Sequence, residues 1–346
     1  MTRAAILSLA LLLAPAPLAA AGEAQQPQQP RRLEVPATAA WQHAATEMIL
    51  PARSAGLERG EISDLGDDEM DVVAQYRGGE GVVATVYLFR TSVPDVALWF
   101  DRAATAIASS PQYGSPAAAL AAPSPFARPG APAPSGLRLA LDLGAGELRS
   151  TALAVAPLGA HLLKIRISST RLDSAGIDAL LTRFIEGLRW PAVAKAERAA
   201  APIQPCPEPL RLRNARVVRA TMGDALMDAL TGIAVESAAT EQAPAFCREP
   251  GATQQYGVYR PGASREAYLI ALNDAGIALS VGQAIDLAEL SGGRRGRRRI
   301  SMTLLGRNMT SVLPSFDRLP PPAQAVAVAF SGRGPGISVT TSEPRD

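Results

Sequence analysis

The sequence predicts an α+β protein in which antiparallel strands are flanked by amphipathic helices, and three observations support this. Residues 71–110 have the pattern of a strand, a glycine-rich turn, a second strand and a helix. Two segments, 96–107 and 174–188, place apolar side chains at the spacing of one helix face. Short apolar runs separated by Pro-Gly and Asn-Asp-Ala-Gly turns predict further antiparallel strands in the second half of the chain.

The first 21 residues have the pattern of a signal peptide. Arg3 gives a short basic region, Ala4 to Leu13 an apolar stretch, and Ala19-Ala20-Ala21 a small-residue cleavage site. The apolar stretch is shorter than the ~20 residues that a membrane-spanning helix needs. Residues 22–32 are polar and predict a flexible lead. We therefore expect an exported protein, periplasmic or secreted, with no transmembrane segment after cleavage.

Residues 33–192 are predicted to form a first domain. Its clearest secondary-structure pattern lies at residues 71–110. Apolar and polar residues alternate over 71–77, and residues 82–89 are apolar on both parities, as in a central strand with both faces covered. Ser92 is a candidate helix cap, and the apolar positions that follow predict a helix lying on the sheet.

The remainder of this domain contains an insert, more strands and a closing helix. Residues 111–136 hold seven prolines and few large apolar side chains, which predicts a long exposed loop or disordered insert. Strands are expected at 137–142, 148–156 and 161–168. Asp173 or Ser174 is expected to cap the closing helix, which Pro191 ends.

Two local patterns in these residues resemble a known family. Ala84-Thr85-Val86-Tyr87 runs into a helix containing Trp99-Phe100, and the last helix carries Phe184-x-x-x-Leu188-Arg189-Trp190. This order of elements resembles the PsbP-like α/β sandwich of exported bacterial and chloroplast lumenal proteins. The resemblance implies an accessory or interaction role rather than an enzyme, and it transfers no functional residue.

A linker rich in alanine and proline, residues 193–205, is expected to precede a smaller second domain at 206–346. This domain is predicted to be mainly antiparallel α+β. Its helix is expected at 224–235, and its strands at 210–218, 256–260, 268–272, 277–281, 300–305 and 326–330.

The only two cysteines, Cys206 and Cys247, lie in the second domain. In an exported chain the expected state is one disulfide, which would close a loop of about 40 residues. A reactive thiol or metal site is the alternative, but neither cysteine belongs to a C-x-x-C pair.

Few residues suit catalysis or metal binding. His43 and His161 are the only histidines, and no nucleophile elbow, phosphate loop or dinucleotide motif occurs. The acidic residues between Asp64 and Asp71 lack the spacing of a calcium loop. No metal or cofactor is therefore expected, although a carboxylate pair of the glycosidase kind has no fixed spacing in sequence.

The most distinctive polar feature is a run of arginines in residues 294–299. Arg294, Arg295, Arg297, Arg298 and Arg299 follow two glycines. Guanidinium groups pair with phosphate or carboxylate, so the run is a candidate anion-binding loop. The structural alternative is a solvated hairpin loop. No aromatic residue is interleaved, and the formal net charge of the chain is only +2, so a nucleic-acid partner is not expected.

These observations favour an exported, non-catalytic binding or accessory protein of the bacterial envelope. Its partner would be an envelope protein or polymer that the sequence does not identify. Two alternatives stay open: an envelope-directed hydrolase that uses carboxylates, and an anion-binding protein that acts through the arginine loop.

Overall fold

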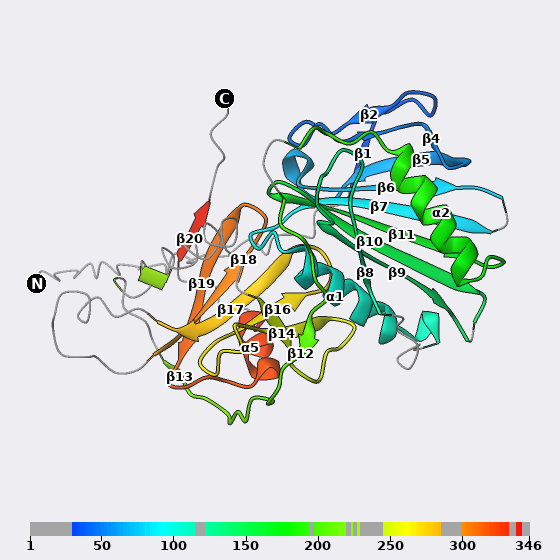
Figure 1. The fold of residues 1–346 in the computed structure, drawn as a ribbon. Helices are drawn as coiled ribbons and strands as arrows, with labels where there is room; N and C mark the ends of the chain where they lie inside the picture. Colours follow the sequence, from blue (N-terminus) through cyan, green and yellow to red (C-terminus); the bar gives the residue numbers. More distant parts are fainter. Residues whose placement is uncertain are drawn as a thin grey trace, which may run out of the picture.

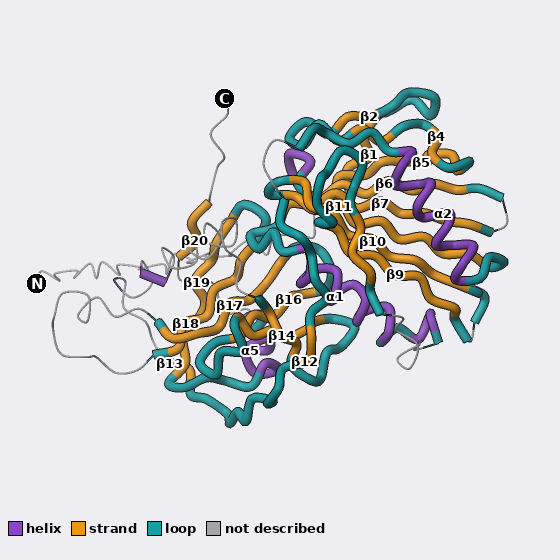
Figure 2. Tube along the Cα trace, viewed as in Figure 1, coloured by secondary structure: helices purple, strands orange, loops and turns teal. Residues whose placement is uncertain are grey.

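The computed structural model describes most of the chain. It covers residues 30–79, 81–114, 122–144, 146–193, 197–218, 223, 227–228, 245–284, 299–331 and 337–340. Within these residues the protein consists of two mostly antiparallel sheets with helices packed on them (Figure 1, Figure 2), which confirms the α+β prediction. The predicted signal peptide 1–21 and most of the lead 22–32 lie outside the described residues.

The first sheet contains all the strands predicted in the first half of the chain. Its strands are β1 (Arg31–Leu33), β4 (Arg53–Ser54), β5 (Leu57–Asp64), β6 (Asp71–Arg77), β7 (Val82–Arg90), β8 (Ser124–Phe126), β9 (Gly136–Asp142), β10 (Ser150–Leu158) and β11 (His161–Ser169). They lie in the order β1-β5-β6-β7-β11-β10-β9-β8, with β4 beside β5. Strands β2 (Trp41–Gln42) and β3 (Ile49–Leu50) form a separate short hairpin.

The second sheet is a meander from β14 to β19, with short strands at its margins. Its strands are β12 (Gln204–Pro205), β13 (Val217–Val218), β14 (Phe246–Arg248), β15 (Tyr256–Pro261), β16 (Tyr268–Leu272), β17 (Ile277–Gln283), β18 (Ile300–Leu305), β19 (Met309–Phe316) and β20 (Ile337–Thr340). Only the β12–β14 pair is parallel among the described strands.

Three helices and the two sheets form successive layers (Figure 1). Helix α2 (Ser174–Gly187) packs on one face of the first sheet, and α1 (Val96–Ala108) packs on the opposite face over β9 and β10. The other side of α1 packs on β15 and β16, so α1 lies between the sheets. Helix α5 (Pro322–Ala329) covers the far face of the second sheet.

Helix α1 is buried on nearly every side. Trp99, Phe100 and Ile107 pack into the core, as their spacing predicts. Asp101 and Arg102, on the side that the pattern leaves polar, are also buried because the second sheet covers them. The predicted cap was wrong. Asp95 caps α1 by accepting a 2.8 Å hydrogen bond from Leu98 N, whereas the Ser92 hydroxyl donates to the carbonyl of Gly306.

The two sheets share one hydrophobic core. Phe89 and Trp99 from the first half of the chain belong to the same buried cluster as Tyr259, Leu269 and Leu305 from the second. The turn before β17 lies against the end of β7. Gly276 has φ +78°, and a Cβ there would lie 2.8 Å from the carbonyl oxygen of Arg90, so glycine permits this approach.

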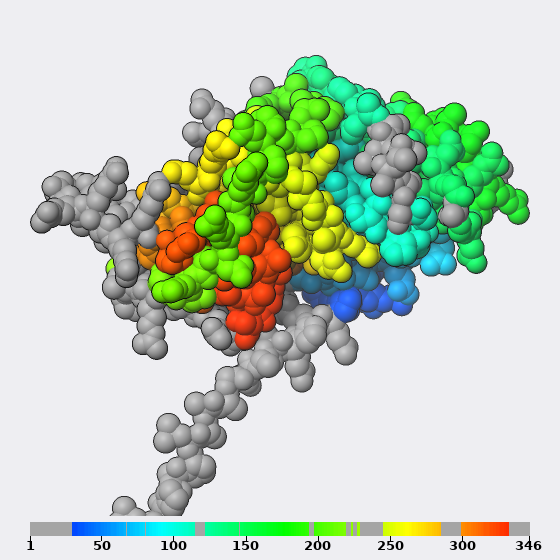
Figure 3. All heavy atoms as spheres, turned by 90° about the horizontal axis from the view of Figure 1, so that it is seen from below, coloured from blue at the N-terminus to red at the C-terminus, as the bar shows by residue number. Residues whose placement is uncertain are grey.

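The predicted insert and linker are more ordered than expected in their described parts. Within 111–136, strand β8 pairs with β9, and the buried Arg128 forms a 2.6 Å ion pair with Glu197 of the predicted linker. Arg128 also lies over the Trp190 ring, 5.6 Å from its centroid. The contacts of Arg128, rather than the packing of large apolar side chains, therefore hold the described parts of the insert and the linker in place. Figure 3 shows residues 197–218, in lime green, running across the surface of the second sheet.

The second half of the chain departs from prediction at three places. Residues 326–330 were expected to form a strand, but residues 322–329 form helix α5, which Pro322 begins at a position that tolerates a missing N–H. Of the predicted strand 210–218 only β13 is present. Strand β19 was missed because Pro314 interrupts its pattern, and the structure places that residue at a register shift between β18 and β19. Most of the predicted helix 224–235 lies outside the described residues.

Candidate functional site

The charged groups between the sheets are paired with one another. Asp101 of α1 accepts a 2.9 Å hydrogen bond from the Tyr259 hydroxyl and pairs with Arg248. Burial raises the pKa of Asp101, and Arg248 and Tyr259 oppose that effect. Arg307 likewise forms an ion pair with Asp71, the first residue of β6. These carboxylates are therefore engaged in joining the two sheets rather than facing a substrate.

Lys164 of β11 is the only lysine among the described residues, and it is buried. Its Nζ donates to Asp274 Oδ2 at 2.7 Å and to the Asp274 carbonyl at 2.9 Å. The same nitrogen lies 4.1 Å from the centroid of the Tyr87 ring. Burial lowers the pKa of Lys164 and outweighs the stabilising effect of Asp274. The side chain is only 4% exposed, so it cannot meet a ligand from solvent.

No described helix covers one part of the first sheet. Helix α1 covers β9 and β10, whereas the same face of β6, β7 and β11 reaches solvent. The alternation of the strands places half-buried or exposed side chains there. We call this surface the open face; it consists of Val73, Gln75, Arg77, Val83, Thr85, Tyr87, Arg166 and Ser168.

The register of the three strands arranges these side chains in rows. Gln75 lies opposite Thr85, which lies opposite Arg166. In the next row Arg77, Val83 and Ser168 face one another in the same manner. The row of Gln75, Thr85 and Arg166 thus combines an amide, a hydroxyl and a guanidinium group across three neighbouring strands. Such groups provide both donors and acceptors for a polar ligand.

Arg166, on the β11 side of the open face, is its most distinctive residue. Its Cζ lies 4.4 Å from the centroid of the Tyr113 ring, in a cation–π contact. Its Nε is buried without a hydrogen-bond partner. No described residue forms a hydrogen bond or an ion pair with its guanidinium group, although Asp274 is near enough for Arg166 to contribute to the lowered pKa of that carboxyl. Burial raises the pKa of Tyr87, and Arg166 partly opposes the rise.

Arg166 differs in this respect from every other buried or half-buried arginine in the described part of the chain. Arg102 donates to the carbonyls of Asn273 and Gln254, both at 2.7 Å. The others likewise hold carboxylate or carbonyl oxygens; they are Arg59, Arg90, Arg128, Arg138, Arg248, Arg260, Arg299 and Arg307. A stacked guanidinium with free donors is a preformed site for an oxyanion.

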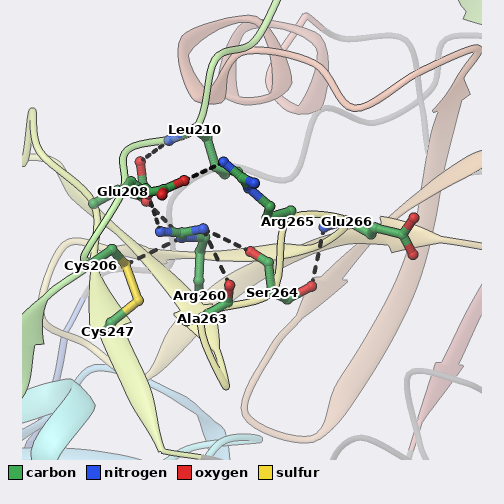
Figure 4. A network of polar contacts seen from close by, with 10 residues as sticks. Cys206, Glu208, Leu210, Cys247, Arg260, Ala263, Ser264, Arg265 and Glu266 are labelled. Carbon is green, nitrogen blue, oxygen red and sulfur yellow. Dashed lines mark hydrogen bonds and ion pairs between the residues drawn. A yellow bond between two sulfur atoms is a disulfide. The ribbon is translucent and has the colours of Figure 1, made fainter.

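The structure confirms the predicted disulfide between Cys206 and Cys247. Figure 4 shows Arg260 lying against it, with Nε 3.2 Å from Cys206 Sγ. The same guanidinium forms a 2.7 Å ion pair with Glu249 and donates to the carbonyls of Ala263 and Ser264. This network joins the segment after the linker to β14 and β15. It contains no free thiol.

Only one residue of the predicted arginine loop, Arg299, lies within the described residues. Arg299 forms a bidentate ion pair with the buried Asp228, at 2.5 and 3.1 Å, and donates to Ser315 Oγ at 2.8 Å. Its guanidinium is therefore engaged within the protein. Arg294, Arg295, Arg297 and Arg298 lie outside the described residues.

The acidic residues before β6 have structural partners. Asp64 accepts hydrogen bonds from Gly66 N at 3.1 Å and Glu69 N at 3.2 Å, and pairs with Arg31. Among the described residues, no group of three or more His, Cys, Asp and Glu is placed to hold a metal ion. Likewise, no described helix has the length and apolar character needed to cross a bilayer.

The two histidines, far apart in sequence, are buried side by side with ring centroids 5.2 Å apart. Thr46 N donates to His43 Nδ1 at 3.2 Å, so Nε2 must carry the hydrogen that reaches the Glu69 carbonyl at 2.9 Å. His43 is thus neutral. Burial lowers the pKa of His161 to about 3, and His43 and Arg90 add to the effect.

Because both histidines are buried, lowering the pH is expected to destabilise the folded protein. Unfolded His161 takes up a proton near pH 6.5, whereas the folded residue does so only near pH 3, so its contribution to stability is complete above pH 6.5 and falls toward pH 3. We expect the free energy of unfolding to be about 2 kcal/mol lower at pH 5 than at pH 7 because of His161. Urea unfolding at both pH values measures it, and His161→Phe should reduce the difference by that amount. An unchanged pH dependence in the variant would contradict the assignment.

Sequence reasoning missed the open face. The residue pattern of β11 shows that Arg166 alternates with Ile165 and Ile167 and so faces away from the core of α2. Tyr113, however, lies in the predicted insert, and no local signal indicates that its ring supports Arg166. Comparison of the chain with protein-family models, with curated proteins and with solved structures finds no match.

Proposed function

We propose that this chain is an exported, non-catalytic binding or accessory protein of the bacterial envelope, periplasmic or secreted, and that its partner binds the open face. The observation that carries the proposal is Arg166, a half-buried guanidinium that lies over the Tyr113 ring and has no oxyanion partner among the described residues. The disulfide suits an oxidising compartment. Helices on opposite faces of the first sheet agree with a PsbP-like first domain, a group whose members mostly act as accessory proteins.

Charge supports an acidic partner. Arg77 and Arg166 lie on the open face, and Lys164 at its margin is balanced by Asp274. Glu58 and Glu61 of the neighbouring β5 are already paired with arginines. The surface is therefore basic without relying on the net charge of the chain. Such a patch attracts anionic groups at low ionic strength and loses affinity as salt rises.

The two alternative functions find less support. The buried carboxylates whose pKa is raised and that face the second half of the chain, Asp71 and Asp101, are both held by arginines. A hydrolase would need such a group to be open to substrate. The arginine loop contributes one described residue, Arg299, which is paired with Asp228.

Arg166→Gln tests the proposal. We expect the mature wild-type protein to co-purify from native envelope extract with an acidic ligand whose recovery falls at least tenfold in the variant, because the variant lacks the cationic fork. Arg183→Gln is the matched control, since Arg183 is an exposed arginine of α2 on the opposite side of the first sheet.

Two results would contradict the proposal. Equal recovery with wild type and Arg166→Gln would remove the open face as the binding surface. A change in the mass of the recovered ligand after incubation with the protein would remove the non-catalytic role.

A further inference from the structure

We propose that the open face binds an acidic saccharide, with Arg166 pairing with a sugar carboxylate. This inference rests on the proposed function and specifies its ligand. The Arg166 guanidinium favours a ligand that carries a carboxylate. The Cζ of Arg166 lies 4.4 Å from the centroid of the Tyr113 ring, and a guanidinium held on one side by an aromatic ring can pair bidentately with a planar carboxylate through its terminal nitrogens. Its Nε is buried without a hydrogen-bond partner, and no described residue accepts a hydrogen bond from its other two nitrogens.

The neighbours of Arg166 match a hydroxylated ligand. Gln75 and Thr85 lie in the same row, and Ser168 lies in the next row of the same face. Their amide and hydroxyl groups can both donate to and accept from sugar hydroxyls. Each of these side chains is half-buried or exposed, so a ligand can reach them. The spacing of alternate residues along a strand, about 6.6 Å, places these groups around a ligand of one or two sugar rings.

A peptide fits this surface less well. The open face lies in the interior of the sheet, where the backbone groups of β7 are paired on both sides, so an added strand would find no free edge. Peptide binding otherwise depends on apolar or aromatic anchors in pockets. Val83, at 38% exposure, is the only well-exposed large apolar side chain of the described open face. The Tyr113 ring is already covered by Arg166.

Calorimetric titration with a galacturonic acid trimer tests the inference, with the neutral galactose trimer and a hexaglutamate peptide as comparison ligands. The wild-type protein should bind the acidic trimer, bind the neutral trimer at least tenfold more weakly, and prefer the trimer to the peptide. Arg166→Gln should weaken trimer binding ten- to a hundredfold, as expected for the loss of a charge-assisted pair. Arg166→Lys should fall between the two because it keeps the charge but not the fork.

Arg183→Gln should bind the trimer as the wild type does, and circular dichroism should show that all variants are folded. Equal binding of the acidic and neutral trimers, or an unchanged affinity in Arg166→Gln, would overturn the inference. Tighter binding of hexaglutamate would instead assign the site to acidic protein segments. If Arg166-dependent co-purification from envelope extract persists while the acidic trimer does not bind, this inference fails and the proposed function stands.

Discussion

Replacing Arg102 by methionine should lower the free energy of unfolding by about 3–5 kcal/mol. The Arg102 side chain is fully buried, and it donates from α1 to the backbone carbonyls of Asn273 and Gln254 beside the second sheet, both at 2.7 Å. A third donor reaches Thr105 Oγ1 at 2.9 Å. Methionine removes all three hydrogen bonds and leaves both carbonyls without their Arg102 donor, and that loss exceeds what the burial of methionine returns.

The same experiment tests whether the two sheets form one cooperative body. All three tryptophans lie within residues 33–192, and Trp41 and Trp190 pack in the core of the first sheet, so tryptophan fluorescence mainly reports that part of the chain. Hydrogen exchange of residues 256–283 reports the second sheet. We expect the two probes to give one coincident urea transition, shifted together in Arg102→Met, because both sheets pack on α1. The exposed Arg183→Met control should change stability by less than about 0.5 kcal/mol. Two separate transitions, of which only one shifts, would contradict the shared core.

Removing the disulfide should have an effect of similar size. Cys206 and Cys247 are separated by 41 positions, and the chain-entropy model gives about 4 kcal/mol for closing a loop of this length. The double variant Cys206→Ala/Cys247→Ala should lose most of that stability. It should also loosen Arg260, which is 2% exposed and lies against Cys206. Guanidinium unfolding of the oxidised protein, the reduced protein and the variant measures this.

The reduced protein and the double variant serve as controls for each other. Both lack the covalent link, but only the variant lacks the sulfur atoms that contact Arg260. Equal losses would assign the effect to the cross-link. Unchanged stability in both would contradict the stabilising role assigned to the cross-link.

Much of the first sheet follows from local pattern. Strand β6 has the predicted bounds, and Asp173 caps α2 as expected, with its Oδ1 accepting from Gly176 N at 2.8 Å. These elements are specified by periodicity and by capping chemistry within a few residues. The same local logic failed for α5, where alternating alanine and valine has the period of a strand but follows a helix-starting proline.

The arrangement of the two sheets could not be predicted in this way. Asp101 meets Arg248, and Lys164 meets Asp274, across more than a hundred positions of sequence. Nothing in a charged side chain's own neighbourhood identifies a partner so distant. The sequence of α1 therefore does not indicate that the second sheet covers its polar side. For the same reason, the lack of a partner for Arg166 becomes visible only when the partners of the other arginines are known.

The central claim, that the open face is the binding surface, is tested most directly by photo-crosslinking. A benzoylphenylalanine at Thr85 lies in the row of Arg166, and one at Arg183 lies on α2, on the other side of the sheet. In intact envelopes, the claim predicts a crosslinked product from position 85 that disappears when Arg166→Gln is added, and none from position 183. Crosslinking from position 183 alone, or a product from position 85 that persists without Arg166, would contradict it.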